Sequence, residues 1–145
     1  MQGTWDNHAA QSDADYPDNS TCRLLDLLGQ ALRWPDEEFK RRYPELIAQI
    51  ERDCRQQEEW LESMPSVHAR QHLEEHARML GVMHHTAFCV MQGDIAMGRT
   101  ATFLLADWIR VHAETMDKPL SDAILQKRLR LRPRSRAADD LIDIR

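Results

Sequence analysis

Apolar residues recur at spacings of three and four along four stretches of this chain, and short breaks separate the stretches. Such spacing places the apolar side chains on one face of a helix. Pro44 either starts the second helix or kinks it, because proline cannot donate the backbone hydrogen bond of a helix interior. Four helices with short connections predict an all-α fold, an antiparallel up-down-up-down four-helix bundle. The expected helices cover about residues 19–34, 45–63, 67–92 and 100–117.

The length of 145 residues suits a single domain with a tail at each end. We expect a flexible, polar N-terminal segment over residues 1–18, the bundle over 19–120 and a C-terminal tail over 121–145. The stretch KRLRLRPRSR, residues 127–136, gives this tail six Lys or Arg, although the chain as a whole has a formal net charge of -5. An acidic body with a short basic tail is not typical of a nucleic-acid-binding domain. The tail is either a solvated end or a contact for an unknown partner.

The sequence also carries information about the cellular compartment. No apolar run approaches the roughly 20 residues that a membrane span needs, and the N-terminus lacks the basic start and apolar core of a signal peptide. Three cysteines, Cys22, Cys54 and Cys89, are too few and too widely spaced for a disulfide scaffold. We therefore expect a cytoplasmic protein whose thiols are available for metal or redox chemistry.

Several polar residues fall on the expected inner faces of the helices. Glu58 shares the apolar stripe of the second helix with Cys54, His72 and His76 share that of the third, and His112 lies on that of the fourth. A single His-x-x-x-His pair is more often exposed to solvent, but a glutamate and three histidines facing one core are costly unless they satisfy one another or a ligand. Imidazole and carboxylate groups suit iron, zinc, manganese or copper, so this convergence predicts a metal site inside the bundle.

The segment ADWIRVHAETMDKPL, residues 106–120, resembles the closing helix of the hemerythrins, and specifically of the bacteriohemerythrins. There a histidine is followed five residues later by an aspartate, here His112 and Asp117. The pair His72-x-x-x-His76 resembles the third-helix motif, and CRQQEEWL and CRLLDLLGQAL resemble the second-helix and first-helix motifs. Residues five apart in an α-helix point about 140° away from each other, so Asp117 would have to reach round from the helix end.

The resemblance implies two irons inside the bundle. One iron would be held by His72, His76 and His112, and Glu58 and Asp117 would bridge the two irons. The family holds its second iron with two more histidines, one on the first helix and one on the second. In this chain both of those positions are occupied by cysteine.

These cysteines are Cys22 and Cys54, and three outcomes are open for them. They can bind a metal as thiolates, form a redox-active disulfide, or simply fill the core of a decayed half-site. The register of the second helix has an alternative as well. A register without a gap would place Asp53 and Gln57 where we expect Cys54 and Glu58, and we favour the latter pair because Glu-Glu-x-Leu matches the family motif.

Dioxygen binds the family's di-iron site at the less fully coordinated iron, which is the one altered here. We therefore expect a protein that binds iron, as one or two ions, and senses or binds oxygen or a related small oxidant, with zinc as the alternative metal. No nucleophile–base pair is evident, so the sequence favours a binding protein over an enzyme. Two rival hypotheses are a thiol switch through Cys22 and Cys54, and a degenerate bundle that acts as an interaction module displaying the basic tail.

Overall fold

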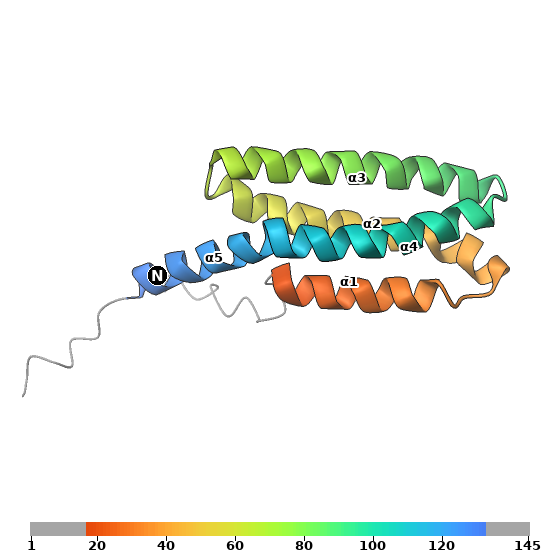
Figure 1. Cartoon of the computed structure of the whole chain (residues 1–145), viewed down its shortest axis with the longest axis horizontal. Coiled ribbons are helices and arrows are strands. Elements are labelled where there is room, and N and C mark those ends of the chain that lie inside the picture. The colour runs from red at the N-terminus through yellow and green to blue at the C-terminus, as the bar shows by residue number, and fades with distance from the viewer. Residues whose placement is uncertain (1–16, 133–145) are drawn as a thin grey trace, which may run out of the picture.

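Four helical rods joined by short turns make up the described part of the chain, residues 17–132 of a computed structural model (Figure 1). The last rod is continuous, because α4 runs through a π-helical turn, η2, into α5 (Figure 1). The rods lie side by side along one direction, and the prediction of an all-α antiparallel four-helix bundle is confirmed. The elements are α1 (Pro17–Ala31), α2 (Asp36–Glu62), α3 (Val67–Met91), α4 (Ile95–His112), η2 (Ala113–Asp117) and α5 (Lys118–Leu131).

Two of the expected breaks lie inside helices. α2 begins at Asp36, so Pro44 does not start it and lies inside it, on its exposed side. Gly98 is the fourth residue of α4, which begins earlier than expected because the Asp94 carboxylate accepts a hydrogen bond from the Met97 backbone N–H at 3.1 Å. Gly98 is a close-packing position, since a Cβ there would overlap Val90 Cγ2.

The chain also continues as a helix beyond the boundary expected at residue 120. α5 extends to Leu131, and its residues Leu120 and Ile124 are buried against Leu61 and Ala69 of α2 and α3. The first residues of the basic stretch therefore belong to a helix that packs on the bundle. The N-terminal segment up to residue 16 and the rest of the tail, residues 133–145, lie outside the described residues.

The apolar core consists of two separate clusters at different heights along the bundle. The larger cluster includes Phe39, Tyr43 and Val90, which are fully buried, and the smaller one contains the α5 residues that cover α2 and α3. Between them lies a layer of buried polar side chains from α3, α4 and η2, with His72 and Asp117 among its members. This polar layer is therefore closed by hydrocarbon above and below. No helix within residues 17–132 has the length and apolar character required to cross a bilayer.

Candidate metal centre

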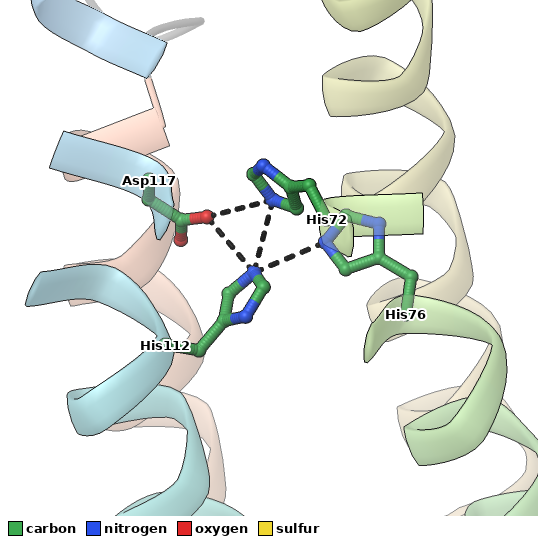
Figure 2. A group of neighbouring side chains, drawn as sticks. All are labelled: His72, His76, His112 and Asp117. Carbon is green, nitrogen blue, oxygen red and sulfur yellow. Dashed lines mark hydrogen bonds and ion pairs between the residues drawn. The ribbon is translucent and has the colours of Figure 1, made fainter. Parts of the chain in front are cut away.

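Three histidines and one aspartate converge in the polar layer (Figure 2). His72 and His76 project from successive turns of α3, His112 from the end of α4 and Asp117 from the end of η2. Each of the four side chains is buried, with residue exposures of 2 to 6%. One ligand atom from each residue lies within 4.8 Å of the others, and no other group of His, Cys, Asp and Glu in the described part of the chain meets this requirement.

The distances inside this group resemble those between ligands that share an ion. His112 Nε2 lies 3.2 Å from His76 Nε2 and 3.0 Å from His72 Nε2. Asp117 Oδ1 lies 3.0 Å from His112 Nε2 and 3.2 Å from His72 Nε2. Ligands held about 2.0 to 2.1 Å from a tetrahedral ion lie about 3.3 Å from one another. Neither contact of Asp117 Oδ1 has the alignment of a hydrogen bond, so this buried oxygen has no donor among the described residues.

The π-helical turn explains how Asp117 reaches the group. In an α-helix, a residue five positions after His112 would point about 140° away from it. In η2 the Lys118 backbone N–H bonds to the Ala113 carbonyl, five residues earlier, and this wider turn brings Asp117 round to the side of His112. The backbone of the π-helical turn therefore brings Asp117 to His112, as expected of a residue that reaches round from the helix end. The signal for this in the sequence was the spacing of five residues between His112 and Asp117.

Protonation states in the metal-free protein suit a cation. Burial, together with the neighbouring imidazoles of His72 and His112, lowers the pKa of His76 to about 3, so its ring is neutral at neutral pH and offers a lone pair. Burial by itself would raise the pKa of Asp117, but the adjacent imidazoles of His112 and His72 lower it to about 2. Neutral imidazole and ionised carboxylate are the forms in which these groups bind metal. The residues present therefore fit a divalent ion such as iron or zinc.

Neighbouring side chains lie against two of the rings. The Trp108 indole stacks on His112, with ring centroids 4.5 Å apart and an interplanar angle of 14°. Glu58 Oε1 lies 3.7 Å from His76 Nδ1, on the opposite side of that ring from the Nε2 that faces the group. A carboxylate behind a ligating histidine helps to set its tautomer and orientation. The structure thus places Glu58, whose side chain is 34% exposed, behind His76 and not within the group.

Two polar residues next to the group were not among the predicted site residues. Gln57 is 6% exposed, and its Oε1 lies 3.0 Å from His72 Nε2. On α1 the inward residue is Thr21, whose hydroxyl donates to Asp117 Oδ2 at 3.4 Å. The sequence did contain a signal for Gln57. The alternative register of the second helix, without a gap, places Gln57 at the position that we assigned to Glu58.

The two cysteines expected at the second half-site are free and lie in different environments. Cys22 is exposed, whereas Cys54 is buried. Burial raises the pKa of Cys54 to about 12, and the charges of Glu58 and Asp53 add to the effect, so its thiolate is strongly disfavoured. The structure brings neither cysteine into the group of metal-ligand atoms. Cys54 instead borders a small cavity of about 30 Å³ beside that group, which Thr21 and Gln57 also line.

Comparison with known proteins gives one relative that agrees with this structure. No protein-family model matches the chain, and no solved structure matches it either. A curated protein from Ralstonia nicotianae (strain ATCC BAA-1114 / GMI1000), named bacteriohemerythrin, is 24% identical over 122 residues, which cover 83% of this chain and 85% of the relative. This relative and the antiparallel bundle with its buried His–Asp group together support a hemerythrin-like family for the chain.

Proposed function

We propose that this protein binds one non-heme iron ion through His72, His76, His112 and Asp117, and that it thereby senses or binds oxygen or a related small oxidant. The observation that carries the proposal is the convergence of four buried ligand atoms within 4.8 Å of one another. Without a cation, three imidazole nitrogens would face one another in a layer closed by hydrocarbon, where unpaired polar atoms are costly.

The donor set and the relative together favour iron. Imidazole nitrogen and carboxylate oxygen bind iron and zinc equally readily as ligand types, so the donors alone do not separate the two metals. The relative's name, bacteriohemerythrin, supports iron for this chain. When bound, an iron ion supplies reversible one-electron redox chemistry and an affinity for small diatomic ligands. Zinc has no redox chemistry and would make the same site structural.

The chain's own residues favour one ion over two. Of the two carboxylates expected to bridge a pair of irons, only Asp117 lies in the group, and Glu58 lies behind His76. The space beside the group is lined by the neutral side chains of Thr21 and Gln57 and by Cys54, whose thiol is protonated in the metal-free protein. Two divalent ions a few ångströms apart repel each other strongly unless anionic ligands lie between them.

The surroundings of the group limit the access of water and the size of any ligand. The two apolar clusters close the polar layer along the bundle axis. The adjacent cavity of about 30 Å³ has room for a molecule the size of water. A small oxidant therefore fits beside the proposed ion, whereas a larger organic substrate does not.

Elemental analysis of protein purified under nitrogen tests the proposal. We expect about one iron per chain and a visible spectrum that changes on exposure to air. His76→Ala should abolish stoichiometric binding, because it removes a buried nitrogen that lies 3.2 Å from His112 Nε2. His68→Ala is the matched control, since His68 is exposed on the same helix and should leave the metal content unchanged. Full metal retention in the His76 variant would refute the site, and a colourless protein with one zinc would refute the oxidant-sensing function.

A further inference from the structure

We propose that Gln57 is a fifth protein ligand of this ion, binding through its side-chain amide oxygen. The inference rests on the proposed function, because it assigns a further residue to the same centre. Gln57 lies on α2, a helix that contributes none of the other four ligands. The ion would then be held by three of the four rods of the bundle.

The position of the amide oxygen supports this assignment. Gln57 Oε1 lies 3.0 Å from His72 Nε2, and four of the pairs of ligand atoms within the group are separated by the same 3.0 to 3.2 Å. The residue is buried to the same extent as His112, at 6% exposure. It faces His72 from α2, which packs beside the helix that carries His72 and His76. Its oxygen thus lies at a ligand-to-ligand distance from one member of the group, His72.

Hydrogen-bond chemistry gives a second, independent reason. In the metal-free protein, Gln57 Oε1 can accept a hydrogen bond only if His72 Nε2 carries a proton. When that nitrogen gives its lone pair to an ion, the proton is lost and the buried amide oxygen loses its donor. A buried acceptor without a partner is costly, and the ion itself is then the nearest positive centre. Amide oxygens are established ligands of hard and borderline cations.

A neutral fifth ligand also affects the charge at the centre. Asp117 remains the one anionic member of the ligand group, so the amide of Gln57 adds an oxygen donor without adding negative charge. Negative ligands stabilise a trivalent ion more than a divalent one, because the attraction grows with the charge of the ion. Gln57 therefore favours the ferrous state, which is the form that reacts with an oxidant.

Three variants test the assignment. Gln57→Leu removes the oxygen donor and keeps a similar volume, and Gln57→Glu keeps an oxygen donor and adds a charge. Gln56→Leu is the matched control on the neighbouring position, where the amide donates to Glu59 Oε2 and does not face the group. Affinity is measured with cobalt(II) in competition with a chromophoric chelator, and the ligands are counted by X-ray absorption at the cobalt edge. Reduction potentials are measured on the iron-loaded proteins.

If Gln57 is a ligand, Gln57→Leu still binds one cobalt ion, but at least about 10- to 100-fold more weakly, the loss that removal of an outer-shell partner already causes, and has one oxygen neighbour fewer. Gln57→Glu keeps the ligand count and lowers the reduction potential, and Gln56→Leu behaves like the wild type. Weaker binding with an unchanged ligand count would show that Gln57 acts only through His72, and would overturn the assignment. An unchanged potential in Gln57→Glu would overturn it too, even if Gln57→Leu fails to fold. A wild-type protein that binds no ion would instead overturn the proposed function.

Discussion

Acid should destabilise the metal-free protein through His76. Burial and the neighbouring imidazoles lower the pKa of His76 from 6.5 to about 3. Between these two values the unfolded chain takes up a proton at His76 that the folded chain does not. Stability depends on pH in the direction set by this difference, so the free energy of unfolding falls as the pH drops from about 6.5 toward about 3. The contribution of the neutral ring is fully present above pH 6.5.

The size of the effect follows from the two pKa values. Between pH 7 and pH 5, His76 takes up a proton only in the unfolded state, because its pKa in the folded state lies well below this interval. Uptake of that proton lowers the free energy of unfolding by about 2 kcal/mol over this interval. This is a large fraction of the roughly 5 to 15 kcal/mol that stabilises an ordinary domain.

Urea unfolding of chelator-treated protein at pH 7 and pH 5, followed by circular dichroism, measures the loss. His76→Gln removes the titrating ring, so its drop in free energy should be smaller than that of the wild type by about 2 kcal/mol. His68→Gln removes an exposed histidine from the same helix and should show the wild-type drop. An equal pH dependence in the wild type and His76→Gln would refute the reasoning, because it would mean that the buried ring takes up its proton without unfolding.

Two further predictions concern packing and thiol reactivity. Gly98→Ala should lower the free energy of unfolding by about 1 to 3 kcal/mol, because its Cβ would overlap Val90 Cγ2. Gly81→Ala, in a helix with no atom within 4 Å of the new Cβ, should be neutral or stabilising in the same urea assay. Cys22 should react with an aromatic disulfide reagent much faster than Cys54, which is buried and has a pKa raised to about 12. Cys54→Ser should remove the slow phase, and a rapid reaction of Cys54 would contradict the buried thiol.

The bundle could be predicted because its signals are local and repeated. Helical spacing over four stretches and short connections were enough to give the number and direction of the helices. The boundaries were less predictable, since Pro44 and Gly98 act as helix breakers only when their surroundings do not compensate. Pro44 lies on an exposed face of α2, and Gly98 lies where α4 packs closely on its neighbours.

Three histidines and Asp117 were predicted for the site, and the structure brings all four together. Each histidine lies on a clear apolar stripe, so its direction was determined by its own helix. Asp117 was found through the family resemblance, because a regular α-helix would have directed it elsewhere. The π-helical turn that resolves this depends on the packing of the whole rod and has no simple signature in the sequence beyond the spacing itself.

Glu58 was expected in the group and lies one position from the buried Gln57, and helical phase explains the difference. On α2 the buried residues Ile50, Cys54, Gln57 and Leu61 follow one another at spacings of four, three and four, the regular alternation of a helix in a bundle. The expected stripe contained Glu58 in place of Gln57, which gives two successive spacings of four. Moving by one residue along an α-helix changes the direction of the side chain by about 100°. The neutral amide of Gln57 therefore faces His72 and the Glu58 carboxylate lies behind His76. A one-residue step in phase thus separates a site for two bridged ions from the proposed site for one.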